Sequence, residues 1–264
     1  MGTLRALLRV LALTVLTLAV YLCLLVSKPV GWLSRPAGLS LENTWVRTWA
    51  RGSAWVMGLR IRASGPPPKP PFFLVVNHLS YVDIVVLATK VHGRFLAKSE
   101  IARWPITGFL ASSVGTLFVE RARPRDLTRI LPMIQERLGS GAGVIVFPEG
   151  TSTHGERVER FKPSLFEVAV RTECPVYTAA LGYSTPPPSP PAHLSVCWWG
   201  EMTFLPHFFR LLMLPGIDAT VAFGPEPIRA DDRKALAGLA QRAVESRFTP
   251  VVGCLLYTSD AADE

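Results

Sequence analysis

Apolar residues dominate the first part of the chain. Residues 10–26 carry no charged side chain, and Ala6 to Leu8 extend this stretch past Arg9 to a length that can span a bilayer. No Ala-x-Ala site follows, and the residues before Cys23 are too bulky for a lipoprotein cleavage box, which argues against a cleaved signal peptide. We therefore expect a retained membrane anchor. Its orientation stays open, because basic residues flank the stretch on both sides.

The next segment, residues 40–57, follows a helical period. Trp45 and Trp49 share one face, and Arg47 and Arg51 lie opposite. Tryptophan favours the headgroup layer of a bilayer, so one interpretation is an interfacial helix with its arginines toward lipid phosphate. A tryptophan stripe that packs in the protein core is the other, and the pattern leaves both open. Residues 1–58 are thus predicted to form the membrane anchor and an amphipathic, interfacial helix.

Beyond a stiff proline-rich connector at 66–71, short apolar runs alternate with helical patterns. The expected strands are residues 59–63, 72–76, 94–97, 116–119, 143–147, 176–181, 194–199 and 219–223. The expected helices are residues 126–138, kinked at Pro132, and residues 232–248, capped by the Asp231-Asp232 pair. The bulky segment 204–214 is either core or a second membrane contact. This alternation predicts an α/β domain over residues 59–253, with a mixed, largely parallel sheet flanked by helices.

The last residues of the chain, 254–264, resemble a translated sequencing adapter, and we treat them as an artefact. The true carboxyl terminus is therefore expected to be missing. The tail carries Asp260, Asp263 and Glu264 but no base, so its removal raises the net charge from +8 to +11. A basic chain suits nucleic acid or anionic lipid, and the apolar amino terminus favours a lipid bilayer as partner over nucleic acid.

The cysteines predict neither a disulfide framework nor a metal site. Outside the tail, Cys23, Cys174 and Cys197 form no Cys-x-x-Cys pair and have no histidine at zinc spacing. His154 and Glu156 lie two residues apart in a polar turn, a pattern more typical of solvated surface than of metal ligands. Scattered thiols of this kind fit a reducing compartment.

Candidate chemistry follows the apolar run 72–76. His78 comes just after it, and Asp83 is the fifth residue beyond the histidine, an offset that would turn the two side chains about 140° apart in a continuous helix. If the run is a strand and Ser80 caps the next helix, Asp83 comes close to the imidazole. The carboxylate can then fix the tautomer and leave the other nitrogen as a base. On this motif alone, a simple capping box with His78 as a loop residue stays open.

Two further motifs follow, GTLFVER at 115–121 and VFPEGTST at 146–153, each at the end of an expected strand. With these motifs in order, residues 72–175 resemble the glycerolipid acyltransferase family. The residues that match the sequence motifs of this family are Asn77, His78 and Asp83; Phe118, Val119 and Arg121; Phe147, Pro148, Glu149, Gly150 and Thr151; and, more weakly, Pro175 and Val176.

The resemblance implies transfer of an acyl group from acyl-CoA or acyl carrier protein to a lysophospholipid, with no other cofactor. The leading expectation is a 1-acylglycerol-3-phosphate O-acyltransferase that makes phosphatidic acid. Acylation of another lysolipid such as lyso-ornithine lipid, and a non-catalytic lipid-binding protein, are the alternatives. His78 would be the general base and Asp83 would orient its ring, so no protein nucleophile is needed. Consistently, the chain lacks a Gly-x-Ser-x-Gly elbow.

The remaining expected roles concern substrate binding and location. Arg121 is the first choice for the acceptor phosphate because of its fork geometry, and Glu149 either helps to form the acceptor site or braces Arg121. The expected substrate-binding residues are Asn77, Lys98, Arg121, Glu149, Gly150 and Thr151. Because acyl thioesters occur in the cytoplasm, we expect the catalytic domain on the cytoplasmic face of an inner membrane.

Overall fold

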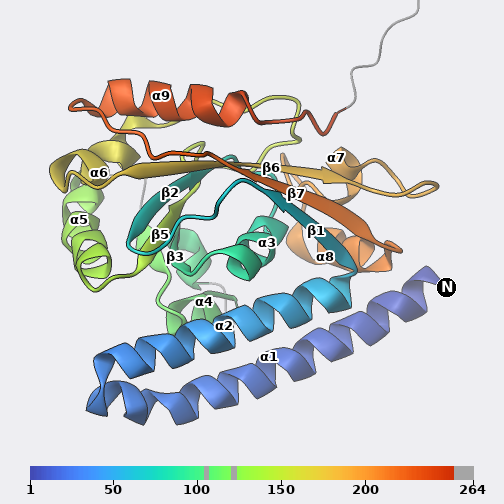
Figure 1. Ribbon diagram of the computed structural model, residues 1–264. Helices are drawn as coiled ribbons and strands as arrows, with labels where there is room; N and C mark the ends of the chain where they lie inside the picture. Colours follow the sequence, from blue (N-terminus) through green and yellow to red (C-terminus); the bar gives the residue numbers. More distant parts are fainter. Residues whose placement is uncertain (104–106, 120–123, 253–264) are drawn as a thin grey trace, which may run out of the picture.

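A single mixed sheet organises the protein. The computed structural model describes residues 1–103, 107–119 and 124–252, and in this part of the chain seven strands form a sheet in the order β1-β7-β6-β2-β5-β3-β4 (Figure 1). The strands are β1 Leu59–Ser64, β2 Phe72–Val76, β3 Gly93–Lys98, β4 Leu117–Val119, β5 Gly143–Val146, β6 Val176–Ser184 and β7 Ile217–Phe223. Only the β6–β7 pairing is antiparallel among these strands. The predicted mixed, largely parallel sheet is confirmed.

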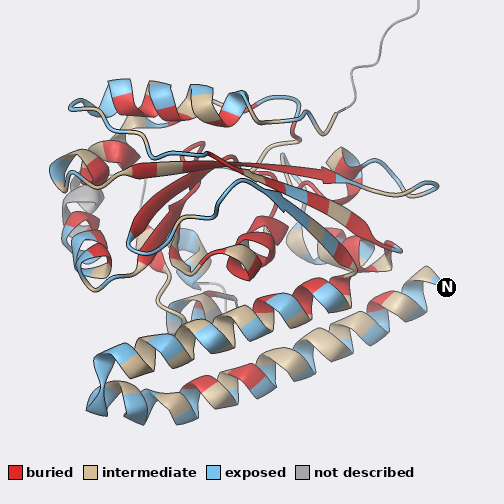
Figure 2. Cartoon of the chain, in the orientation of Figure 1, coloured by how far each residue is buried: buried red, intermediate tan, exposed pale blue. Residues whose placement is uncertain are grey.

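Helices cover both faces of this sheet (Figure 1). One face packs against α5 Pro124–Gly139, α6 Glu167–Arg171 and α9 Arg233–Glu245, and the other against α3 Val82–Lys90 and α8 Phe204–Met213. Short elements complete the chain: α4 Thr107–Ser113, α7 Ala192–Ser195 and the 3-10 helices η1 Ser99–Arg103 and η2 Pro163–Phe166. Central strand β2 is buried on both faces, as its continuous apolar sequence predicts (Figure 2).

The amino-terminal helices α1 Gly2–Leu33 and α2 Arg35–Met57 lie side by side beneath the α3 and α8 layer (Figure 1). By length and composition, α1 could cross a membrane, and its outward face is largely exposed (Figure 2). The indoles of Trp45 and Trp49 donate to Ser27 Oγ and Thr17 Oγ1 of α1, at 3.0 and 3.1 Å. Of the two interpretations of this stripe, the structure therefore supports a packing face between the two helices.

Two helices near the carboxyl end follow the predicted pattern. Helix α9 begins where the sequence indicates, because the Asp232 side chain accepts hydrogen bonds from Lys234 N and Ala235 N, at 2.8 and 2.9 Å. Helix α8 buries His207, Leu211 and Leu212 in the core.

The strand predicted at 194–199 is wrong. Its first two residues end α7, and an irregular segment follows in which Val196 and Cys197 are buried. This segment is tied to the turn after β2 by a bond from Trp198 N to Leu79 O, at 2.9 Å. A short apolar run marks burial without specifying the backbone conformation, which explains the error. Arg121 and the tail 254–264 lie outside the described residues.

Candidate functional site

The site forms at the carboxyl end of β2, in the turn that leads to α3. Asn77, the first residue of this turn, is buried, and its side-chain amide pairs with the backbone of Leu181 in β6: Nδ2 donates to Leu181 O at 3.0 Å and Leu181 N donates to Oδ1 at 2.7 Å. The amide thus continues the ladder between β2 and β6 one residue beyond the strand. These contacts hold the turn in place, and a substrate-binding role for Asn77 stays a prediction.

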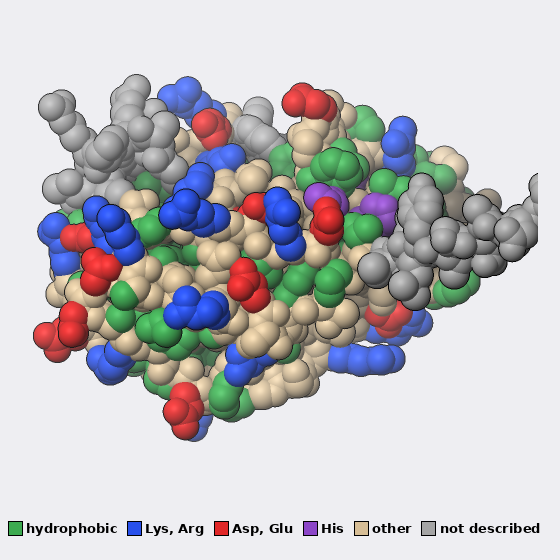
Figure 3. Space-filling view, turned by 90° about the horizontal axis from the view of Figure 1, so that it is seen from above, with side chains coloured by type: hydrophobic (Ala, Val, Ile, Leu, Met, Phe, Trp, Pro, Cys, Tyr) green, Lys and Arg blue, Asp and Glu red, His purple; other side chains and the backbone are tan. Residues whose placement is uncertain are grey.

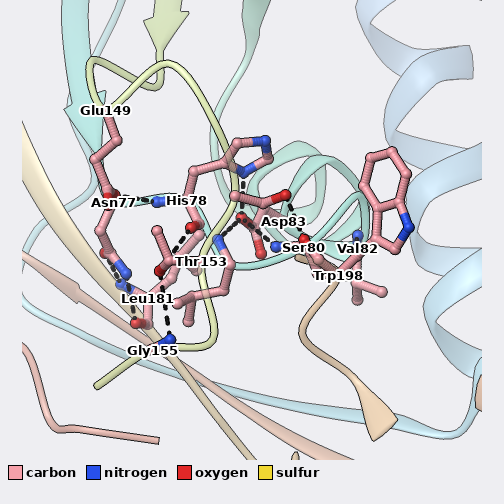
Figure 4. Close-up of polar contacts among 12 residues, drawn as sticks. Asn77, His78, Ser80, Val82, Asp83, Glu149, Thr153, Gly155, Leu181 and Trp198 are labelled. Atoms are coloured by element: carbon pink, nitrogen blue, oxygen red, sulfur yellow. Dashed lines mark hydrogen bonds and ion pairs between the residues drawn. The ribbon is translucent and has the colours of Figure 1, made fainter. Parts of the chain in front are cut away.

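His78 and Asp83 meet as the motif predicts. Asp83 lies in the first turn of α3 with its side chain 0% exposed, and its Oδ2 lies 2.7 Å from His78 Nδ1 (Figure 4). The same oxygen accepts hydrogen bonds from the backbone N–H groups of Leu79 and Ser80, at 2.8 and 3.1 Å. The carboxylate therefore orders the whole turn as well as the imidazole. Ser80 contributes a longer contact, 3.4 Å from Val82 N to its Oγ, at the start of the helix.

The imidazole of His78 is oriented but accessible. Its ring stacks on Phe147 with centroids 4.1 Å apart, and the side chain is 21% exposed. Because Nδ1 faces a carboxylate, the tautomer with the proton on Nδ1 is favoured and Nε2 keeps a free lone pair. No described group forms a hydrogen bond to Nε2. The arrangement can therefore accept a proton at Nε2, with a buried anion behind the ring to stabilise the imidazolium.

Glu149 reaches the same turn from the loop after β5. Its Oε1 accepts a hydrogen bond from His78 N at 2.6 Å (Figure 4). Its Oε2 accepts one from Glu159 N at 3.0 Å. The side chain is buried, and this burial raises its pKa to about 8, against the opposing effect of the two hydrogen bonds. Both carboxylate oxygens are thus occupied by backbone donors. The described contacts support a role in bracing the His78 turn, and a place in an acceptor site stays a prediction.

The residues after Glu149 form a tight loop around the turn. Gly150 has φ 85°, in the left-handed region that favours glycine, and its N–H bonds to Phe147 O at 3.2 Å. Thr151 is exposed, and Thr153 N donates to His78 O at 3.0 Å. The backbone of His78 is therefore held on both its N–H and its C=O by the 147–159 loop.

The sequence analysis missed Tyr183. Its hydroxyl donates a hydrogen bond to Asp83 Oδ1 at 2.6 Å, from β6 on the opposite side of the carboxylate from His78. Burial, reinforced by the charge of Asp83, raises the pKa of this hydroxyl well above its usual value. Tyr183 lies outside the sequence motifs, so the sequence gives no sign of its role. Only the pairing of β6 with β2 brings it beside the turn.

The structure describes one of the two expected basic residues, Lys98. Lys98 is exposed and ends β3, which runs parallel to β5, so its end points to the edge that carries His78. Arg121 comes two residues after the end of β4 but lies outside the described residues. Their roles in binding an anionic headgroup stay predictions. Among the described residues, no cluster of three or more His, Cys, Asp or Glu could hold a metal ion.

An apolar cavity of about 260 Å³ lies between the α1–α2 pair and the sheet. Lining residues from the helices and from β3 include Val20, Tyr21, Trp49, Ala88, Phe95 and Ala111. Phe95 also stacks on Phe147, with centroids 6.2 Å apart, and Phe147 in turn stacks on His78. The cavity therefore begins two rings away from the imidazole. At its margin Arg94 is buried and paired with Glu42 of α2, at 2.9 Å.

The outer surfaces of the two helical layers differ. Seen from the α9 side, basic and acidic side chains are interspersed (Figure 3). The α1 side instead exposes large apolar side chains, among them Leu4, Leu7, Leu8, Leu11, Val15, Leu18, Leu22, Val26 and Trp32. Most of these residues recur at the helical spacing of three and four, so they share one face of α1, and an extended exposed apolar face is unusual on a protein surrounded by water.

Comparisons with known proteins agree with one another. A family model described as Acyltransferase matches residues 60–182. A lyso-ornithine lipid O-acyltransferase of Brucella abortus is 36% identical over 230 residues, which cover 79% of this chain and 83% of that protein. One from Pseudomonas aeruginosa is 32% identical over 210 residues, covering 77% and 78%. A 1-acyl-sn-glycerol-3-phosphate acyltransferase of Neisseria gonorrhoeae is 31% identical over 144 residues, covering 54% and 56%.

The fold has also been seen before. The crystal structure of the 1-acyl-sn-glycerophosphate acyltransferase PlsC from Thermotoga maritima superposes with a TM-score of 0.64 over 93% of this chain and 97% of that one, at 22% sequence identity.

Proposed function

Since this chain belongs to the acyltransferase family whose members acylate lysolipids, we propose that it transfers a fatty acyl group to the free hydroxyl of lyso-ornithine lipid. The extent of similarity supports this acceptor. The match to a lyso-ornithine lipid acyltransferase covers 79% of the chain, whereas the match to a 1-acylglycerol-3-phosphate acyltransferase covers 54%. The second candidate acceptor is 1-acylglycerol 3-phosphate, which the shared motifs favour equally.

In the proposed reaction, His78 is the general base. Nε2 takes the proton of the acceptor hydroxyl as its oxygen attacks the thioester carbonyl, and Asp83 stabilises the imidazolium that forms. Collapse of the tetrahedral intermediate breaks the C–S bond, and the departing thiolate takes the proton back from Nε2. The ester and a free thiol result, and His78 returns to its starting state. General base catalysis of this kind contributes about 10²- to 10⁴-fold to the rate.

The two substrates approach the histidine from different sides. The acyl chain enters the apolar cavity that begins beyond Phe147 and Phe95, because burial of apolar surface favours this position. The acceptor headgroup lies at the sheet edge where Lys98 ends β3, and Arg121 is the second expected basic contact. An ornithine acylated on its α-amine keeps a free carboxylate beside its δ-ammonium group, and a lysophosphatidic acid carries a phosphate. A basic pair suits the anionic group of either headgroup.

The α1 side of the protein faces the bilayer in this proposal. Arg5 and Arg9 of α1 donate to the carbonyls of Met213, Leu212 and Leu214, at 2.9, 3.1 and 2.6 Å, so the start of α1 is tied to α8. Trp45 and Trp49 tie its middle and end to α2. These contacts favour a helix that lies along one membrane surface with its leucine face in lipid. The catalytic domain then lies on the cytoplasmic side of the inner membrane, where acyl-CoA and acyl carrier protein are present.

The observation that carries this proposal is the accessible His78 imidazole, oriented by Asp83 and separated by Phe147 and Phe95 from an apolar cavity. A panel of acceptors tests the function. Purified full-length protein in lipid vesicles would be given labelled acyl-CoA or acyl carrier protein with lyso-ornithine lipid, 1-acylglycerol 3-phosphate or no acceptor. Acylation of lyso-ornithine lipid is the expected result. Acylation of the phosphate lipid alone would select the second candidate, and release of free fatty acid without acceptor would indicate a hydrolase. No turnover with any acceptor would leave lipid binding as the activity.

A further inference from the structure

The carboxylate of Asp83 is bound very unequally at its two oxygens. Oδ2 accepts from His78 Nδ1 and from the N–H groups of Leu79 and Ser80. Among the described residues, Tyr183 is the partner of Oδ1, at 2.6 Å. Three donors on one oxygen hold that atom but leave the carboxylate able to turn about it. A fourth donor on the other oxygen fixes the plane of the group.

Tyr183 is itself rigidly placed. Strand β6 pairs with β2 as far as Ala179, opposite Val76, and then continues along β7, where Tyr183 lies opposite Ala219. Its hydroxyl therefore comes from the sheet and not from the turn that carries His78. A donor on a strand keeps its position even when the turn moves with substrate, which suits a fixed reference for Asp83.

Burial makes this donor matter energetically. Asp83 has no exposed side-chain surface, and an ionised carboxylate without water needs hydrogen-bond donors on both oxygens. Tyr183 is also buried, and the raised pKa of its hydroxyl keeps it protonated, so it acts as a donor at every working pH. It stabilises the anion without exchanging a proton with it.

We propose that Tyr183 is a positioning residue for the His78–Asp83 pair. Its hydrogen bond fixes the plane of the Asp83 carboxylate. The same bond draws negative charge away from Asp83 and so sets the basicity of His78. This inference rests on the proposed role of His78. It assigns Tyr183 no contact with substrate and no covalent step. The expected signature is a change in the proton affinity of His78, which a residue that only fills space would not cause.

Other titratable groups near the dyad do not duplicate this role. Cys197, from the segment after α7, lies near Asp83, and burial and that charge raise the pKa of its thiol, so it stays neutral. Glu149 contacts the His78 backbone from the loop after β5 and titrates near pH 8. Neither forms a described hydrogen bond to Asp83. Glu149 is present in every variant compared below, so its effect on the pKa of His78 is the same in each. A difference in that pKa between variants therefore reports the effect of Tyr183.

The test compares Tyr183→Phe with Tyr177→Phe. Tyr177 lies on the same strand, is half-buried, and its hydroxyl has no partner among the described hydrogen bonds. The primary readout is the pKa of His78, measured by NMR titration of the imidazole in the full-length protein. This measurement requires no substrate. Removal of the Tyr183 donor leaves Asp83 a stronger base that holds the imidazolium more tightly, so the pKa of His78 rises. Tyr177→Phe leaves it unchanged.

Kinetics provide the second readout, with the acceptor that the panel identifies. Without the Tyr183 donor the Asp83 carboxylate can turn about Oδ2, so the imidazole is oriented less well and kcat should fall, with KM for donor and acceptor little changed. The acidic limb of the kcat profile should move to higher pH, because the free base forms only there. An unchanged pKa of His78 and an unchanged limb would overturn the proposal, even if kcat fell.

A third variant covers the case in which Tyr183→Phe does not fold. Incorporation of 3,5-difluorotyrosine at position 183 keeps the shape and the hydroxyl but makes it a stronger donor. The pKa of His78 should then fall and the acidic limb should move to lower pH. A shift in the same direction as that expected for Tyr183→Phe, or no shift, would refute the role. The NMR result stands whether or not an acceptor is found, so failure of this inference is distinguishable from failure of the proposed function.

Discussion

The carboxylate of Glu149 accepts a hydrogen bond from the backbone N–H of His78, at 2.6 Å. This bond joins two motifs that are 71 residues apart in the chain. It connects the loop after β5 to the turn after β2, and these parallel strands are neighbours in the sheet. The two motifs therefore build one structure, in which the third motif holds the backbone of the residue that the first one supplies.

Loss of the imidazole should abolish turnover without loss of structure. We expect His78→Ala to lower kcat by at least about 10²-fold, because the acceptor hydroxyl then has no base. Its side chain is partly exposed, so folding and vesicle binding should persist. Rates of lysolipid acylation, with circular dichroism and vesicle flotation as controls, check this. Activity equal to that of the wild type would refute the assignment of the base.

Glu149→Gln should weaken the turn around His78. The amide keeps one acceptor oxygen but presents an NH₂ to the other backbone donor, so one of the His78 and Glu159 N–H groups loses its partner. An unsatisfied buried group costs about 1–3 kcal/mol of unfolding free energy. We expect a loss of this size in denaturant titrations and a lower kcat. A variant with full stability and only a raised acceptor KM would instead support a place in the acceptor site.

The titration of Glu149 also predicts a pH dependence of stability. Its pKa is raised to about 8 in the folded protein from about 4.3 in the unfolded chain, so the folded state binds a proton that the unfolded state releases. This contribution is fully present below about pH 4.3 and is lost as pH rises through about 8. Unfolding free energies measured between these values should fall more in the wild type than in Glu149→Gln. Parallel curves for the two proteins would contradict the raised pKa.

The amide of Asn77 should matter for stability more than for substrate affinity. Asn77→Ala leaves Leu181 N and Leu181 O without their partner in a buried place, at a cost of about 1–3 kcal/mol. We expect a lower midpoint in denaturant titrations and an acceptor KM within about twofold of the wild type. A raised KM with unchanged stability would restore the expected substrate-binding role.

A larger side chain in the cavity should change donor preference. Ala88 of α3 is buried and lines the cavity, so Ala88→Leu takes space from a bound acyl chain. We expect kcat/KM to fall most for the longest acyl donors, by about 10-fold or more, which corresponds to two buried methylene groups. Ala235→Leu on the exposed side of α9 is the matched control. A uniform loss over all chain lengths would exclude the cavity as the acyl site.

Arg121→Ala tests the expected headgroup contact. Loss of a guanidinium that binds an anionic headgroup removes about 1.5–3 kcal/mol of binding. If this interaction is equally strong in the ground and transition states, acceptor KM rises and kcat changes little. Steady-state kinetics at varied acceptor concentration measure both. Unchanged values of both would remove Arg121 from the acceptor site.

Several features of the fold follow from local patterns. The strands β2, β3, β5 and β7 lie close to their predicted positions, because β-branched and aromatic residues in short runs bounded by turns have few other ways to be buried. The contact of His78 with Asp83 was also predictable. It requires only that a strand end before the histidine and a helix begin after it. The segment 194–199 failed because its apolar residues are buried beneath a turn and not in the sheet.

The chain itself determined the positions of most strands, the motif that pairs an imidazole with a carboxylate, and the apolar character of the first helix, since each depends on residues close together in the sequence. Only the tertiary structure decided that Tyr183 donates a hydrogen bond to the second oxygen of Asp83, that Glu149 holds the His78 backbone, and that the tryptophan face of α2 packs on α1. These contacts join residues far apart in the chain. They depend on which strands become neighbours, and that is settled by how the whole chain buries its apolar surface.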